Sequence, residues 1–195
     1  MKTIYYHLLI DASKSMSRYW DALVKQLNAH YKTTRKFEAL YPIDLKRGIG
    51  VFNIENIFLD MIMQSPAILK KIKPDGRTAL YDAIKTNIDF VENELLKAQS
   101  AIDTTTIFVV LTDGHENASK LYDAQQVRET IMKLQQEGNW EFVFFGADLD
   151  VNEINKILKI PHFNYHNFEK SELKSAFEEL NDIVLKTLKK STQAQ

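Results

Sequence analysis

The feature that most constrains the fold is an apolar run at residues 4–10 that passes directly into Asp11, Ser13 and Ser15. The run is apolar or aromatic almost throughout and does not alternate with polar residues. Such a pattern is typical of a strand buried on both faces, as in a parallel sheet covered by helices. We therefore expect the acidic and hydroxyl residues to follow the carboxyl end of a central strand.

Further short apolar runs alternate with segments of helical periodicity along the rest of the chain. The predicted strands are 4–10, 48–53, 57–63, 106–111, 140–145 and 162–165. The predicted helices are 16–33, 78–97, 121–137, 151–158 and one that begins near residue 171. This alternation predicts an α/β, doubly wound, mostly parallel sheet with helices on both faces. The hairpin of 48–53 and 57–63 predicts one antiparallel edge strand.

Length and composition exclude several classes of protein. The 195 residues are expected to form a single domain over 1–190, followed by a frayed tail at 191–195. The net charge of −1 gives no electrostatic reason to expect a nucleic acid or a membrane as partner. The absence of cysteine excludes disulfides, thiolate catalysis and sulfur-ligated zinc. Neither a signal peptide nor a membrane span is visible, so a cytoplasmic location is expected.

Five oxygen-bearing residues are placed where strands or loops give way to helices. Asp11, Ser13 and Ser15 share one loop, Thr78 opens the helix at 78–97, and Asp113 follows the strand at 106–111. Ligand sites in open α/β sheets lie at the carboxyl ends of the strands, so the five can meet at one edge. Their oxygens suit a small hard divalent cation, but they leave its coordination incomplete.

These residues and their flanks carry a family resemblance. The order Asp-x-Ser-x-Ser, distant Thr, distant Asp resembles the metal-ion-dependent adhesion site (MIDAS) of von Willebrand factor type A domains. The sequence around Thr78 and Asp113, and the strand that begins at Trp140, are similar to stand-alone bacterial members. The resemblance spans nearly the whole chain, with no departure at any ligand position.

The resemblance implies a Mg²⁺-dependent protein-binding module with a Rossmann-like fold. Ser13, Ser15 and often Thr78 would contact the metal directly, and Asp11 and Asp113 would often act through water. Mn²⁺ or Ca²⁺ are alternatives to Mg²⁺. An Asp or Glu of a partner protein would complete the coordination, and the chain is expected to be a monomer in isolation. The candidate residues for the rim that meets the partner are Lys14, Arg18, Arg77, His115 and Glu116.

Other interpretations of the same residues remain open at this point. Asp11 and Ser13 can cap a helix, and Asp113 before a glycine can form a turn. An aspartyl-phosphate phosphatase of the haloacid dehalogenase type needs a second carboxylate at position 13, which is serine here. A metal-assisted hydrolase would need a general base near the metal, for which Glu116 is the candidate. His115 could be a ligand or a solvent-facing loop residue.

Overall fold

A six-stranded sheet forms the centre of the computed structural model, which describes residues 2–54, 56–59, 66–97, 104–149, 158 and 164–193. The strand order is β3-β2-β1-β4-β5-β6, and only the β2–β3 pair is antiparallel. The strands are β1 (Lys2–Asp11), β2 (Ile43–Phe52), β3 (Asn56–Leu59), β4 (Thr104–Thr112), β5 (Trp140–Ala147) and β6 (Asn164–Phe168). The predicted doubly wound sheet with an antiparallel edge strand is therefore confirmed.

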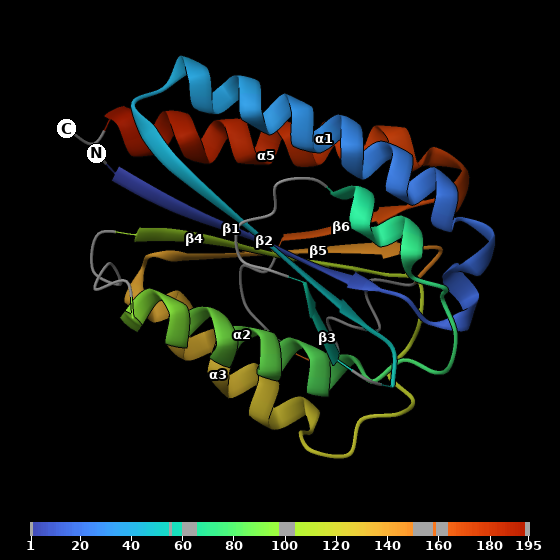
Figure 1. The fold of residues 1–195 in the computed structure, drawn as a ribbon. Coiled ribbons are helices and arrows are strands. Elements are labelled where there is room, and N and C mark those ends of the chain that lie inside the picture. The colour runs from blue at the N-terminus through green and yellow to red at the C-terminus, as the bar shows by residue number, and fades with distance from the viewer. Residues whose placement is uncertain are drawn as a thin grey trace.

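Helices cover both faces of this sheet (Figure 1). Helices α1 (Trp20–Leu40) and α5 (Leu173–Gln193) lie together on one face, and α2 (Leu80–Lys97) and α3 (Ala124–Glu137) lie on the other. Three short 3₁₀ helices complete the described elements: η1 (Lys14–Arg18), η2 (Pro66–Lys71) and η3 (Lys170–Glu172). None of the described helices is long and apolar enough to cross a membrane.

The central strands explain why the first apolar run does not alternate. Side chains of β1 enter two separate cores, with Ile4, Leu8 and Ile10 facing α1 and α5, and Tyr5 and Leu9 facing α2 and α3. A strand between two hydrophobic layers must be apolar on both sides. The end of β1, where the candidate residues begin, is therefore held in the centre of the sheet between two packed layers.

Several element boundaries differ from the sequence-based expectations. The predicted helix at 16–33 is divided into η1 and α1, because the chain makes a tight turn at Tyr19 before α1 begins. The helix η2 was not predicted. It lies against α1, where the Trp20 indole donates a hydrogen bond to the Leu69 carbonyl at 3.1 Å. Residues 191–193 of the expected tail belong to α5, which continues through Gln193, and residues 194–195 lie outside the described residues. Most of the helix expected at 151–158, and residues 60–63 of the third strand, lie outside the described residues.

Candidate metal centre

The structure brings the two candidate aspartates to neighbouring strands in the centre of the sheet. Asp11 ends β1 and Asp113 directly follows β4, and these two strands pair in parallel with Ile10 opposite Leu111. Successive strands are added outward on either side of this pair, so the strand order reverses between β1 and β4. Such a reversal point is where open α/β sheets bind ligands. The two aspartates therefore lie at the same edge of the sheet.

Asp11 is buried and held by hydrogen bonds on both carboxylate oxygens. Its Oδ1 accepts from the Ser13 backbone N–H at 2.7 Å, and its Oδ2 accepts from the Thr112 hydroxyl. Burial raises the pKa of Asp11 to about 6; the hydrogen bonds from Thr112 and Ser13 oppose this rise, and the charge of Asp113 adds to it. A cation beside this carboxylate would favour its charged form.

The two serines connect the β1 loop to Asp113. The Ser13 and Ser15 hydroxyl oxygens lie 3.0 Å apart, and the Ser15 hydroxyl donates to Asp113 Oδ1 at 2.6 Å. Ser13 and Asp113 are buried, whereas Ser15 is exposed at the start of η1. The spacing of Asp11, Ser13 and Ser15 thus curls the loop so that their oxygens lie on one side, next to the second aspartate.

Thr78 reaches the same place from the loop before α2. Its backbone N–H donates to the Asn117 side chain at 3.0 Å, and its carbonyl accepts from the Asn117 N–H at 3.0 Å. A Cβ atom added to Gly114 would lie 2.7 Å from Thr78 Oγ1. The Thr78 hydroxyl is therefore packed directly against the backbone that follows Asp113, in a space that only glycine leaves open. A backbone bond of 3.1 Å from Lys14 N–H to the Gly76 carbonyl joins this loop to the serine loop.

The rim candidates divide into two groups. Lys14, Arg18, Arg77 and His115 are exposed, as a surface that meets a partner requires. Glu116 has a structural role instead, because its carboxylate accepts from the backbone N–H groups of three residues and from one hydroxyl. The donors are Tyr81 N–H at 3.0 Å, Ala118 N–H at 2.8 Å, Ser119 N–H at 2.7 Å and Ser119 Oγ at 2.6 Å.

Two residues that hold candidate ligands, and a third that holds a nearby loop, are absent from the sequence-based prediction of the site. Thr112 orients Asp11, Asn117 holds Thr78, and Asp82 accepts from the backbone N–H groups of residues 120–122 at 2.8–2.9 Å. Asp82 is buried, with 7% of its surface exposed. Its donors lie in the loop before α3 and not in α2, so its location in the first turn of α2 does not indicate this role.

The oxygen atoms of these residues suit a hard divalent cation, whose charge two carboxylates and three neutral hydroxyls would neutralise only in part. Within the described ranges, no three His, Cys, Asp or Glu side chains cluster in a way that could hold an ion. A site at this edge would instead rely on the two aspartates and the three hydroxyls of Ser13, Ser15 and Thr78. Such oxygen ligands suit Mg²⁺, Mn²⁺ or Ca²⁺ better than soft metals.

Comparison with known proteins agrees with this geometry. The sequence model of the von Willebrand factor type A domain matches residues 7–183, which include every candidate ligand. The chain belongs to this family. Among curated proteins, none matches this von Willebrand factor type A domain at a significant level.

Solved structures share the fold at low sequence identity. The von Willebrand factor domain of the type V pili tip protein Mfa5 from Porphyromonas gingivalis has a TM-score of 0.68 and 10% identity, with 96% of each chain covered. Manganese-loaded TRAP protein from Plasmodium vivax has a TM-score of 0.60 and 18% identity, with 89% of this chain and 71% of TRAP covered.

A third similar structure contains metal in its MIDAS motif. Proximal thread matrix protein 1 from the mussel byssus, with a zinc-occupied MIDAS, has a TM-score of 0.62 and 14% identity. The comparison covers 94% of this chain and 46% of the mussel protein, so this domain spans less than half of that relative's length.

Proposed function

We propose that this von Willebrand factor type A domain is a metal-dependent protein-binding module. The observation that carries the proposal is the continuous set of contacts from Asp11 through Ser13 and Ser15 to Asp113, at the reversal point of the sheet. Two similar structures contain a divalent metal, one of them in its MIDAS motif, which supports the same use of this edge here.

In this proposal Ser13, Ser15 and Thr78 contribute hydroxyl oxygens to a divalent cation, preferably Mg²⁺. Asp11 and Asp113 supply the negative charge beside it, either directly or through water. When bound, the cation supplies a Lewis-acidic position that accepts an oxygen from outside the chain. Thr112 and Asn117 keep Asp11 and Thr78 in place, so these two ligands are largely positioned before the partner arrives.

The ligand expected at the open position is an Asp or Glu side chain of a partner protein. Neutral hydroxyls leave part of the cation's charge uncompensated, which favours an anionic ligand over a neutral one. Exposed Lys14, Arg18 and Arg77 lie in the loops that carry the serines and Thr78, and they would attract an acidic surface.

The hydrogen bonds of Glu116 argue against the alternative of a metal-assisted hydrolase. That mechanism needs Glu116 to accept a proton from a metal-bound water. Both Glu116 oxygens instead accept hydrogen bonds from the turn that follows and from the first turn of α2. A carboxylate committed to these bonds serves the fold, so binding is the function that this arrangement supports better.

The proposal is tested by capture of partners on the immobilised domain with Mg²⁺ and, in parallel, with a chelator. A genuine partner is retained by the parent with Mg²⁺ and lost with the chelator. It is also lost on a Ser13→Ala/Ser15→Ala variant, whereas the control Ser17→Ala, which removes an η1 hydroxyl that donates to the Pro74 carbonyl, retains it. If the parent and the Ser13→Ala/Ser15→Ala variant retain the partner equally in the presence of the chelator, a metal does not bridge the two proteins.

A further inference from the structure

A cavity with polar and apolar lining residues lies at the opposite edge of the sheet from the candidate metal centre. Its volume is about 450 Å³, within the range of small-molecule sites. Lys2 begins β1, Thr105 lies near the start of β4, and Glu141 lies near the start of β5. The last turns of α5 close the other side with Lys186, Lys190 and Ser191. At about 3.3 Å per residue, the ten residues of β1 separate the two sites by roughly 30 Å.

The cavity carries an excess of positive charge. Three lysines and one glutamate line it, which leaves two positive charges uncompensated. None of the three lysines forms an ion pair with a carboxylate of the described residues. The carboxylate of Glu141 is partly occupied, since it accepts a hydrogen bond from the Thr187 hydroxyl at 2.8 Å. The cavity therefore concentrates positive potential in a concave surface.

A solvated helix end does not account for this arrangement. Lysine near a helix C-terminus is favoured by the helix dipole, which explains Lys190 in the last turn of α5. Lys2 comes from a strand, however, and lines the same cavity. Lys186 and Lys190 are also four residues apart on one helix, a spacing at which like charges repel. An anion between these groups would relieve the repulsion.

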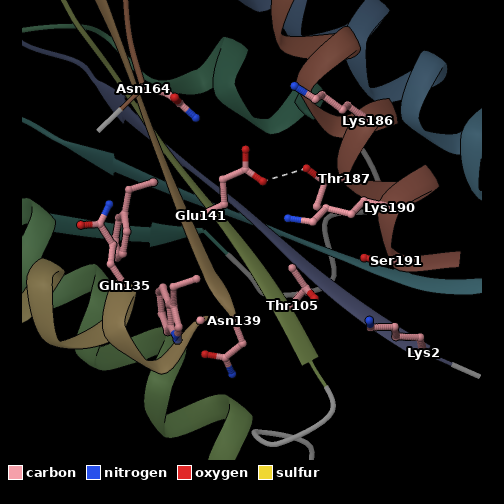
Figure 2. A pocket seen from close by; sticks show the side chains of 13 residues that line it. Lys2, Thr105, Gln135, Asn139, Glu141, Asn164, Lys186, Thr187, Lys190 and Ser191 are labelled. Carbon is pink, nitrogen blue, oxygen red and sulfur yellow. Dashed lines mark hydrogen bonds between the residues drawn. The ribbon is translucent and has the colours of Figure 1, made fainter. Parts of the chain in front are cut away.

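The surrounding donors indicate the kind of anion. Figure 2 shows the Lys190 side chain extending from α5 into the cavity, above Thr105, with Lys2 and Ser191 on the same side. The ammonium groups of Lys2 and Lys190 and the hydroxyls of Thr105 and Ser191 are hydrogen-bond donors from different elements. Donors at different angles suit the tetrahedral oxygens of a phosphate. The described lining contains no arginine to form the planar two-bond contact that favours a carboxylate.

The lining also has an apolar part that could contact the rest of a ligand. Trp140 and Phe142 line the cavity from the other face of β5, and their rings are stacked with centroids 5.5 Å apart. Gln135 and Asn164 add side-chain amides. Mixed polar and aromatic linings of this size are typical of sites for small organic molecules.

We infer that the cavity at the amino edge of the sheet, lined by Lys2, Thr105, Lys186, Lys190 and Ser191, binds a small molecule that carries a phosphate group. This site is independent of the metal centre and does not rest on the function proposed for it. Glu141 opposes the bound anion and limits its affinity.

Calorimetric titration of the full chain tests the inference in metal-free buffer at fixed ionic strength, so that the metal centre does not contribute. The probes are inorganic phosphate, pyrophosphate and glycerol 3-phosphate, with glycerol as the uncharged control. We expect the phosphates to bind and glycerol not to bind. Stronger binding of glycerol 3-phosphate than of inorganic phosphate would identify an organic phosphate as the ligand, and the reverse order would identify the free anion.

Charge variants of the cavity give the decisive comparison. Lys2→Gln and Lys190→Gln should each weaken pyrophosphate binding about tenfold, the effect of losing one hydrogen bond to a charged group. Lys189→Gln removes the same charge from the adjacent position outside the lining and should change binding less than about twofold. Glu141→Gln keeps an acceptor for Thr187 and should strengthen binding. No binding by the parent, or equal weakening in Lys189→Gln and Lys190→Gln, would overturn the inference; circular dichroism verifies that each variant is folded.

Discussion

The Ser15 hydroxyl donates a hydrogen bond of 2.6 Å to Asp113 Oδ1, and this contact joins two loops that are 98 residues apart in the sequence. It links the serine loop after β1 to the aspartate after β4. The backbone bond from Lys14 to Gly76 adds the Thr78 loop to the same assembly. Three chain segments are thus connected before any ion is bound, and this connection sets the expected behaviour of the site.

Mg²⁺ should stabilise the domain, because an ion that binds only the native state raises the free energy of unfolding by mass action. At a hundredfold excess over its Kd, the gain is about 2.7 kcal/mol. Ser13→Ala/Ser15→Ala should remove most of the increase in melting temperature that Mg²⁺ causes. Thermal unfolding with and without Mg²⁺ measures this, with Ser17→Ala as the control. The same Mg²⁺-dependent shift in the double variant and the parent would place the ion elsewhere.

Metal affinity should fall as the pH is lowered through about 6, because protons compete with the ion for the Asp11 carboxylate. Burial raises the pKa of this group from 3.8 to about 6 in the metal-free protein. Metal binding then releases close to one proton at pH 5 and almost none at pH 8. The affinity should change about tenfold per pH unit well below the pKa. Calorimetric titrations in buffers of different ionisation enthalpy measure the released protons. An affinity that is constant from pH 5 to pH 8 would contradict this role of Asp11.

Gly114→Ala should weaken metal binding more than it weakens the fold. The added methyl group would lie 2.7 Å from Thr78 Oγ1, so the hydroxyl must move away from the backbone at Gly114, and a ligand in this position would be displaced. Overpacking of this kind costs about 1–3 kcal/mol in a rigid core, and less where one side chain can rotate. Thr78→Val, which keeps the shape and removes the hydroxyl, should reduce Mg²⁺ affinity further. Mg²⁺ titration and urea unfolding of both variants separate the two effects, and unchanged affinity in both would exclude Thr78 as a ligand.

Two buried histidines should make the fold sensitive to acid. Burial lowers the pKa of His7 and of His30 from 6.5 to about 4, although hydrogen bonds with Asn87 and Asn181 oppose this shift. Both side chains are neutral in the native state at pH 5, whereas the unfolded chain binds protons there. Each histidine therefore contributes stability above pH 6.5 that is lost as the pH falls toward 4, by up to about 1.4 kcal/mol per pH unit.

His7→Gln and His30→Gln isolate this contribution from that of Asp11. The raised pKa of Asp11 acts in the opposite direction, since stability from that group falls as the pH rises from 3.8 through 6. The Asp11 contribution is the same in parent and variant, so it cancels when their free energies of unfolding are subtracted. Urea unfolding at pH 7 and pH 5 should show a smaller loss of stability in each variant than in the parent. Equal losses would show that the histidines are not neutral in the native state.

The sequence predicted the carboxyl ends of β1, β2 and β4 to within one residue, because the apolar pattern stops there, but it missed the first five residues of β2, which begins at Ile43. The unbroken apolar run fixed β1 as central, and the spacing of Asp11, Ser13 and Ser15 required no long-range information. The roles of Glu116 and Asp82 could not be predicted in the same way. Each carboxylate accepts bonds from backbone N–H groups of a loop, and neither the folding of that loop nor its location against α2 leaves a periodic signal. The division of 16–33 into η1 and α1 also depends on tertiary packing, through the contact of Trp20 with η2.

The position of Asp11 and Asp113 at the ends of paired central strands has a consequence for how fast the site can change. Central strands of a buried sheet exchange their amide protons only on rare, near-global opening. The separation of the two carboxylates is therefore fixed on the timescale of ion exchange. Adjustment is left to the serine loop and to Thr78, which belong to segments outside the sheet. Amide exchange around Asp11 should stay slow with or without an ion, while exchange at residues 13–18 and 76–79 reports its arrival.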